Sequence, residues 1–185
     1  MNDLQGFIWE HREDDPARLA LSAKKYPGLA MGYVARQIDA SRKLRKKVPS
    51  WYRPGLEFPL SLSLEQASSE ATARFKAGLF SGVRMADITG GLGVDSFFFS
   101  QTFDEAFYVE REPEILQAAK HNLSVLGRQN IHFESADAEA FLCRYQQPLD
   151  LIYLDPARRN ERKGKVFHLS DCSPNVLEIN HMLLE

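Results

Sequence analysis

A glycine-rich turn at residues 90–93 joins two apolar segments in the second half of the chain. The residues 83–88 before it predict a strand, and the residues 94–99 after it predict a helix. A turn between a strand and a helix places a nucleotide-like ligand against the helix N-terminus. Gly91 and Gly93 would let the backbone approach such a ligand, because neither carries a Cβ atom. Glycine pairs also occur in ordinary turns, so this interpretation depends on the ends of the following strands.

Acidic residues stand at or just beyond the C-terminal ends of four predicted strands: Asp87, Glu110, Asp137 and Asp155. In an open α/β sheet, ligands bind at that edge. Glu110 comes 19 residues after Gly91 and is placed to accept both hydroxyls of a ribose. Asp137 is placed to accept a hydrogen bond from a purine amine. Any one of them alone is more often a helix cap or a turn residue, but together with the glycine turn they predict a nucleoside-containing ligand.

The elements that must position these residues alternate between strand and helix. Further strands are predicted at 106–110, 131–134 and 150–154, and helices at 113–123, at 138–145 and from residue 173. Alternation of this kind predicts an α/β protein with a Rossmann-like, parallel, doubly wound sheet. A sheet of four strands would leave the fourth as an open edge. We therefore expect that a further C-terminal part of the polypeptide, or a partner chain, covers it.

A small helical region at residues 1–60 is predicted to precede the sheet domain at 61–185. One helix starts at Pro16, capped by Asp14 or Asp15, and continues towards Tyr26. A second runs from Met31 towards Lys47, and prolines then break the chain. A third is expected over 64–80, with one apolar face made of Ala67, Ala71, Phe75 and Leu79.

The sheet domain resembles a class I S-adenosylmethionine-dependent methyltransferase over about residues 65–185. Residues 87–93 are similar to the first motif of that family, Glu110 to the ribose-binding acid of its second motif, and Asp137 to the adenine-binding acid of its third. The resemblance implies S-adenosylmethionine as the cofactor and seven strands in the complete domain. It implies these cofactor-binding residues: Asp87, Thr89, Gly90, Gly91, Gly93, Glu110 and Asp137. The first motif is closest to that of RNA-modifying members, including bacterial ribosomal RNA guanine methyltransferases and cap-hypermethylating enzymes.

Residues 155–158, Asp-Pro-Ala-Arg, lie where the family has its fourth motif. In members that act on exocyclic amines this motif is Asp/Asn-Pro-Pro-aromatic, and its carboxylate and following carbonyl accept hydrogen bonds from the amine. The resemblance thus implies Asp155, Pro156 and Arg158 as catalytic residues and favours an exocyclic purine amine of RNA as the target. Arg158 replaces the aromatic residue, and its guanidinium can stack on a base or bind phosphate. This departure leaves the target atom open.

Gln66 and Ser69 lie in a segment with a helix-capping pattern that begins at Ser63. In the family, a similar segment closes over the methionine end of the cofactor. The two residues are therefore candidate cofactor contacts, and a capping role alone is an equal alternative.

Three other functions compete with RNA methylation. In a nicotinamide-dependent dehydrogenase the third fingerprint position would be glycine, but here it is Ser96. A methyltransferase acting on a small molecule or a protein would keep the same cofactor site. A catalytically silent RNA-binding protein would keep the fold alone.

The charge distribution favours a nucleic-acid partner, although the whole chain of 185 residues has a net charge of −2. Residues 1–60 hold 11 Lys and Arg against 7 Asp and Glu. Basic residues gather at 36–53 and again at 158–165, so both stretches are candidate RNA contacts. For the first stretch, a solvated helix face is an equal alternative.

The composition of the chain, 44% hydrophobic and 26% charged, is that of a globular protein. There is no apolar run long enough to span a membrane and no export signal. Cys143 and Cys172 lack the spacing of a metal site. We expect a cytoplasmic protein with reduced cysteines and no bound metal.

Overall fold

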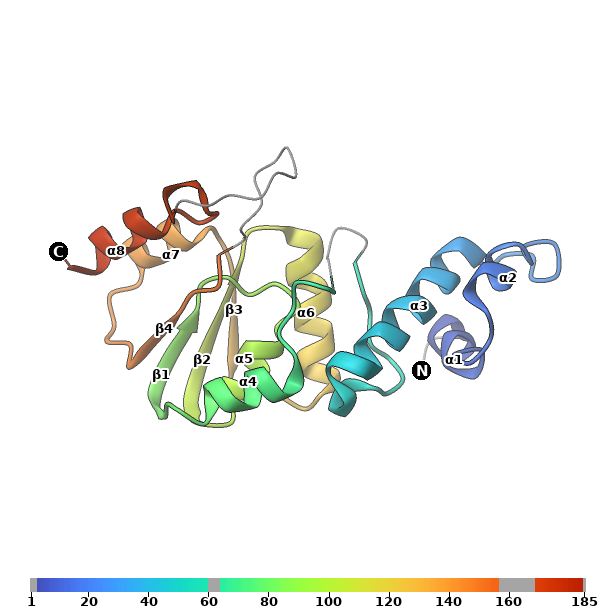
Figure 1. Cartoon of the computed structure of the whole chain (residues 1–185), viewed down its shortest axis with the longest axis horizontal. Coiled ribbons are helices and arrows are strands. Elements are labelled where there is room, and N and C mark those ends of the chain that lie inside the picture. Colours follow the sequence, from blue (N-terminus) through green and yellow to red (C-terminus); the bar gives the residue numbers. More distant parts are fainter. Residues whose placement is uncertain (1–2, 60–63, 157–168, 185) are drawn as a thin grey trace.

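Four parallel strands form the centre of the protein in the computed structural model, which describes residues 3–59, 64–156 and 169–184. The strands are β1 (Gly82–Asp87), β2 (Phe103–Glu110), β3 (Ile131–Ser135) and β4 (Leu151–Tyr153), in the spatial order β3-β2-β1-β4 (Figure 1). The order of the strands reverses after β3, since the chain crosses back to place β4 on the free side of β1, which pairs with both β2 and β4. The predicted Rossmann-like α/β fold is confirmed.

Helices cover both faces of this sheet (Figure 1). Helices α4 (Glu70–Ala77), α5 (Val94–Phe99) and α6 (Pro113–Val125) pack against one face, and α7 (Ala138–Arg144) and α8 (Val176–Leu184) against the other. Successive strand residues point to opposite faces, so Met85 and Tyr108 enter the first core while Ala86 and Val109 enter the second. Burial on both faces explains the continuous apolar run of residues 106–109 in β2.

The N-terminal helices form a separate apolar cluster, on the right of Figure 1. They are α1 (Asp3–Glu10), α2 (Pro16–Ala20) and α3 (Met31–Lys47). Asp15 caps α2 as predicted by accepting a hydrogen bond from the Ala17 N–H, but α2 ends at Ala20. Residues 21–26 continue as tight turns, because Ser22 donates through both its N–H and its hydroxyl to the Leu19 carbonyl.

Helix α3 connects the two parts of the molecule. Val34 and Ile38 in its first half belong to the N-terminal cluster, whereas Leu44 in its second half belongs to the sheet core. The 3-10 helix η1 (Pro49–Trp51) follows it, and Trp51 packs edge-on against Phe97 with the ring centroids 5.4 Å apart. The apolar clusters therefore divide within α3, and a domain boundary at residue 60 remains a prediction.

Helix α4 differs from the sequence prediction in length and in its buried face. It begins after Ser69 and ends at Ala77, so it is much shorter than the expected 64–80. Ala73 and Ala77 are buried, whereas Phe75 is 68% and Leu79 is 58% exposed. The predicted face was wrong because α4 packs beside α5 through its small residues, which allow a close approach of the two helices.

Two expectations concern the surroundings of the protein. No helix among the described residues is long and apolar enough to cross a membrane. Strand β4 pairs with β1 on one side, and among the described residues no strand pairs with its other edge. That a further part of the polypeptide or a partner chain covers this edge stays a prediction.

Candidate functional site

A cavity of about 1090 Å³ lies at the C-terminal edge of the sheet, where the glycine turn meets the ends of β2, β3 and β4. Most predicted site residues line it: Gln66, Thr89, Gly90, Gly91, Gly93, Glu110, Asp137, Asp155 and Pro156. Asp87 and Ser69 are not among the lining residues in the described part of the chain. Arg158 lies outside the described residues. The structure thus brings together residues separated by as many as 90 positions in the sequence.

The glycine turn packs tightly against the β2 residue Tyr108. A Cβ atom at Gly90 would lie 2.5 Å from the Cζ atom of Tyr108, which leaves no room for any side chain at this position. The Tyr108 hydroxyl donates a 2.6 Å hydrogen bond to the Gly91 carbonyl, and burial raises its pKa well above the usual value. Gly91 and Gly93 have φ values of +53° and +82°, in the left-handed region that favours glycine. The Tyr108 side chain therefore holds the glycine turn in one conformation.

Asp87 supports the turn from inside the protein instead of facing the cavity. Its side chain is 1% exposed and accepts hydrogen bonds from the Ser96 hydroxyl at 2.5 Å and from the Thr89 N–H at 3.1 Å. Burial raises the pKa of Asp87 to about 7 and the nearby negative charge of Asp95 adds to this, while the bonds from Ser96 and Thr89 oppose it. The prediction that Asp87 contacts the ligand directly needs correction, because its buried carboxylate accepts hydrogen bonds from Ser96 and Thr89 and so holds the glycine turn.

Ser96 explains why the turn departs from a dinucleotide fingerprint. Where that fingerprint has its third glycine, Ser96 provides a hydroxyl that holds Asp87.

Glu110 lies at the end of β2 with its carboxylate against the turn. Its Oε2 atom accepts a 3.0 Å hydrogen bond from the Gly91 N–H, and Oε1 accepts a 2.9 Å bond from the Glu112 N–H. Each carboxylate oxygen has two lone pairs, so both can accept a further donor from a ligand. The position fits the predicted recognition of vicinal hydroxyls.

Asp137 caps a helix and also faces the cavity, so its predicted contact with adenine stays a prediction. As the N-cap of α7 it accepts a 2.7 Å hydrogen bond from the Ala140 N–H through Oδ1. The side chain is also exposed and lines the cavity. The cap fixes the carboxylate in one orientation at the cavity wall.

Thr89 joins the glycine turn to the fourth motif. Its hydroxyl accepts a 2.8 Å hydrogen bond from the Asp155 N–H, across the boundary between β1 and β4. Asp155 is exposed on the cavity, and Pro156 is half-buried beside it. This bond sets the height of Asp155 relative to the turn.

Sequence analysis missed a polar network centred on Lys76 of α4. The Lys76 ammonium lies 2.6 Å from Asp95 Oδ1 and donates to the Ser68 hydroxyl at 2.9 Å and to the Tyr153 hydroxyl at 2.5 Å. Ser68 and Asp95 line the cavity, and both Ser68 and Tyr153 donate to Asp95. Burial and the charge of Asp95 raise the pKa of Tyr153 above its usual value. Lys76, Asp95 and Tyr153 come from α4, α5 and β4, so no spacing along the sequence indicates this network.

The segment before α4 contributes to the cavity differently from the prediction. Gln66 lines the cavity. Ser69 instead caps α4, accepting a 3.2 Å hydrogen bond from the Thr72 N–H and pairing with the Thr72 hydroxyl at 2.8 Å. The capping alternative for Ser69 is therefore seen in the structure, and a cofactor contact by Ser69 stays a prediction. Ser63, the expected start of the pattern, lies outside the described residues.

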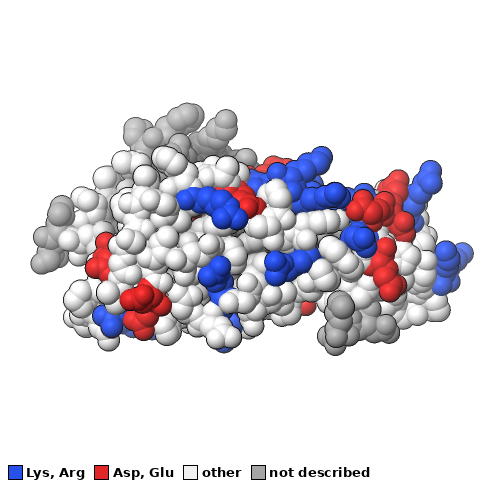
Figure 2. Space-filling model, turned by 90° about the horizontal axis from the view of Figure 1, so that it is seen from below, with Lys and Arg blue, Asp and Glu red and all other residues white. Residues whose placement is uncertain are grey.

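Protein groups engage several of the basic residues at 36–53. Arg42 donates to the carbonyls of Arg12 and Asp14, and Arg45 lies 3.3 Å from Glu13. Figure 2 shows acidic side chains next to the basic ones at the N-terminal end of the molecule. The stretch is therefore partly structural. The second basic stretch, 158–165, lies outside the described residues.

Comparisons with known proteins agree with this geometry. The chain is 28% identical over 130 residues to a 23S rRNA (uracil(747)-C(5))-methyltransferase, RlmC, of Cronobacter sakazakii, covering 70% of this chain and 34% of that protein. It is 33% identical over 98 residues to an RNA methyltransferase of Thermosynechococcus vestitus that is named as uncharacterized, covering 52% of this chain and 22% of that protein. The chain thus spans about a third or less of these relatives. No protein-family model matches it.

A solved structure resembles the chain over almost its whole length. A protein of Porphyromonas gingivalis W83, provisionally assigned as a methyltransferase, superimposes with a TM-score of 0.77 and 30% sequence identity. The match covers 98% of this chain and 45% of that one. The N-terminal helices are therefore part of the shared architecture, and the resemblance that the strand-end motifs predicted is confirmed.

Proposed function

Because the chain has the fold of a class I methyltransferase and resembles RNA methyltransferases in sequence, we propose that it transfers a methyl group from S-adenosylmethionine to a base of RNA. The observation that carries the proposal is the convergence of the glycine turn, Glu110, Asp137 and Asp155 on one cavity. The protein would act in the cytoplasm. The activity is a proposal because the chain covers only part of each relative.

The donor side of the cavity fits S-adenosylmethionine. Its volume of about 1090 Å³ exceeds what a nucleoside-sized ligand needs and leaves space for a target base. The backbone of Gly91 and Gly93 lines the cavity without side chains, where the amino acid part of the cofactor would lie. Glu110 would accept the ribose hydroxyls, and Asp137 the adenine amine. Asp87 would act indirectly, by holding Thr89 and the turn in place.

Asp155 and Pro156 would position the acceptor. When bound, S-adenosylmethionine supplies an electrophilic methyl group on a sulfonium. The Asp155 carboxylate and the following carbonyl would accept the two N–H groups of an exocyclic amine, which aims the nitrogen lone pair at that methyl group. The carboxylate then takes the proton that the nitrogen loses. Most of the rate gain would come from in-line positioning of the nitrogen and the methyl group. Arg158 would stack on the base or bind phosphate.

A second candidate target is the C5 carbon of a pyrimidine, favoured by one observation. Cys172 lines the cavity together with Asp155 and Pro156, and the RlmC relative is named for methylating uracil at C5. A ring carbon is a weak nucleophile. Addition of the Cys172 thiolate to C6 of the ring would move an electron pair to C5. The C5 carbon would then bond to the methyl group of the sulfonium, and the sulfur would leave as a neutral thioether. A base then removes the C5 proton, and the thiolate leaves as the ring double bond forms again.

Calorimetry and a transfer assay test the proposal. The purified chain is titrated with S-adenosylmethionine and then incubated with the cofactor, labelled in its methyl group, and RNA from cells lacking the gene. Labelled nucleosides are identified by mass. Cofactor binding with label in RNA supports the proposal. Label only in proteins or small molecules, or cofactor binding without any transfer to RNA, contradicts it.

Two substitutions distinguish the exocyclic amine from the pyrimidine C5 carbon as the target. Asp155→Ala should abolish transfer to an amine, whereas Cys172→Ser should abolish transfer to a pyrimidine carbon and leave amine methylation unchanged. The mass and retention of the labelled nucleoside identify the atom independently.

A further inference from the structure

A second hollow, of about 310 Å³, lies between the last turns of α3 and the segment that precedes α4. Three lysines surround its mouth: Lys43, Lys46 and Lys47. Its floor is made of buried apolar side chains: Leu44, Val48 and Leu92. The volume falls at the lower end of the range for small-ligand sites. We call this hollow the lysine pocket.

The lysines of the lysine pocket have different partners. Lys47 donates to the carbonyls of Leu64 at 3.2 Å and Glu65 at 2.6 Å, so it fixes the wall formed by that segment. Lys43 lies 2.9 Å from Asp39, one turn earlier on α3. Lys46 is exposed, and no carboxylate within the described ranges lies close enough to form an ion pair with it. Lys46 is thus the cation most available to a ligand.

The lysine pocket adjoins the large cavity. Ala67 and Leu92 line both, and Leu92 belongs to the glycine turn. A ligand that extends from the large cavity past these two residues therefore enters the lysine pocket. A polymer with successive similar units, such as RNA, is long enough to fill both hollows at once.

We propose that the lysine pocket receives a nucleotide of the RNA next to the target nucleotide, with its base on the apolar lining and its phosphates at Lys43 and Lys46. This rests on the proposed function. A base has apolar faces that suit the half-buried Leu64 and Ala67 of the lining, and the charged phosphates lie outside it, where the lysines stand. Three lysines face two carboxylates, Glu65 in the lining and Asp39 beside Lys43, so the mouth keeps a net positive charge, which attracts a polyanion. The proposal thus places the RNA contact at the C-terminal end of α3 and not along the whole basic stretch 36–53.

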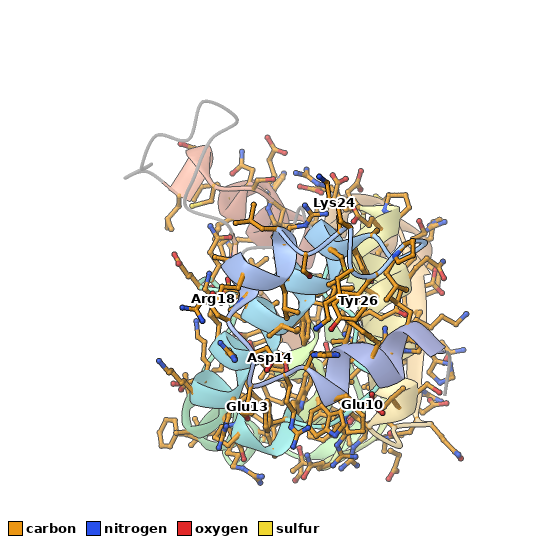
Figure 3. All side chains as sticks on the ribbon, turned by 90° about the vertical axis from the view of Figure 1, so that its right-hand side faces the viewer. Glu10, Glu13, Asp14, Arg18, Lys24 and Tyr26 are labelled. Atoms are coloured by element: carbon orange, nitrogen blue, oxygen red, sulfur yellow. The ribbon has the colours of Figure 1, made fainter. Side chains whose placement is uncertain are left out.

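Salt-dependent binding tests this proposal with matched variants. The full chain binds a fluorescein-labelled RNA decamer of random sequence, followed by anisotropy between low and moderate salt. In Lys46→Gln, the loss of one phosphate contact should lower the slope of log K against log salt by about 0.7. The control is Lys24→Gln, an equally exposed lysine among the N-terminal helices (Figure 3), which should leave the slope unchanged. Equal slopes for the two variants would overturn the proposal.

Cross-linking locates the contact directly. RNA decamers containing 4-thiouridine are irradiated with the full chain, and the labelled peptides are identified by mass. Cross-links to residues 43–48 or 64–67 support the proposal, and cross-links confined to other segments overturn it. Binding of an acidic, leucine-containing peptide that depends on Lys46, with no dependence for RNA, would assign the lysine pocket to a protein partner and also overturn it.

The outcomes distinguish this proposal from the proposed function. If Lys46→Gln leaves methyl transfer to RNA unchanged and the salt slopes of the two variants are equal, only the proposal that the lysine pocket binds RNA is overturned. RNA cross-links at the lysine pocket in a chain that does not bind S-adenosylmethionine overturn the methyl-transfer proposal alone.

Discussion

The large cavity has two walls that are held in different ways. We call the side at the glycine turn and Glu110, where the methyl donor would bind, the donor wall, and the side at Asp155, where the methyl acceptor would lie, the acceptor wall. On the donor wall, the backbone and side chains are joined by a dense set of hydrogen bonds: Tyr108 to Gly91, Gly91 to Glu110, and Ser96 to Asp87. On the acceptor wall, Asp155 is exposed, and its N–H donates to Thr89 of the opposite wall. The donor wall thus has its shape before any ligand binds, whereas the acceptor wall depends on the donor wall for its position.

This difference indicates a division of labour. A rigid donor wall suits one invariant ligand, because preorganised groups lose little entropy on binding. An acceptor wall with few internal contacts can be changed to suit a new target without disturbing the cofactor site. The Lys76 network lies between the two, since it links Ser68 and Asp95 at the cavity to Tyr153 at the end of β4.

The largest effect is expected at the acceptor wall. Asp155→Ala should lower kcat by about 10²–10³, because the amine loses its carboxylate acceptor and its alignment. The affinity for S-adenosylmethionine should stay the same, since Asp155 reaches the donor wall only through its backbone N–H. Steady-state kinetics measures kcat, and calorimetry measures the affinity for S-adenosylmethionine. Asp104→Ala, an exposed aspartate at the start of β2, is the control, and full transfer by Asp155→Ala would refute the assignment.

A change at the donor wall should affect stability and binding together. Gly90→Ala places a Cβ atom 2.5 Å from Tyr108 Cζ, so the ring or the turn must move. We expect the free energy of unfolding to fall by about 3 kcal/mol, the upper range for overpacking. Urea denaturation measures this. Gly6→Ala in α1, where nothing lies within 4 Å of the added atom, is the control. An unchanged Gly90→Ala protein would show that the donor wall is not rigid.

Glu110→Ala should weaken cofactor binding without affecting folding as strongly. Loss of the carboxylate strands the Gly91 and Glu112 N–H groups and removes the ribose acceptor. We expect a cost of about 2 kcal/mol in binding, or about thirty-fold in Kd. Calorimetry with S-adenosylmethionine checks it, again beside Asp104→Ala. Unaltered affinity would exclude Glu110 from the cofactor site.

The smallest effect concerns the pH dependence of the donor wall. The pKa of Asp87 is raised to about 7 in the folded protein, against about 3.9 in the unfolded chain. The folded state therefore binds the proton more tightly, and this stabilising contribution is complete below pH about 4 and is lost as the pH rises towards 7. Between pH 5 and 6 the free energy of unfolding should fall by up to about 1.4 kcal/mol per pH unit from this group.

Urea denaturation at pH 5, 6 and 7 tests this dependence against Asp87→Asn. The amide keeps an acceptor for the Thr89 N–H and does not titrate, so the slope that Asp87 contributes should disappear. An identical slope in the variant would show that Asp87 is not the titrating group.

Local patterns in the sequence identified most of the cavity lining. The glycine turn, Glu110, Asp137 and Asp155 are each defined by their position after an apolar strand, and the parallel sheet brings strand ends together without further information. The strand-helix order and a cap at Asp14 or Asp15 followed from the same short-range rules, and the structure places the cap at Asp15. These features needed only spacing and residue type.

Side-chain direction and burial could not be obtained in this way. Spacing alone does not show that Asp87 turns inward to Ser96, that Ser69 turns along α4, or that Phe75 points to solvent. Nor does it show that Lys76 meets Asp95, since the two lie on different helices. Each depends on which neighbours a residue meets after packing.

The sequence by itself therefore determined the fold class, the edge of the sheet that binds ligand and the acidic residues along it, because strand ends and turns are encoded locally. Only the tertiary structure decided which carboxylates face the cavity and which hold the glycine turn through hydrogen bonds. It also decided that the end of α3 meets residues 64–67 to form the lysine pocket. Burial and pairing between distant segments arise from the packed chain, and spacing along the chain does not encode them.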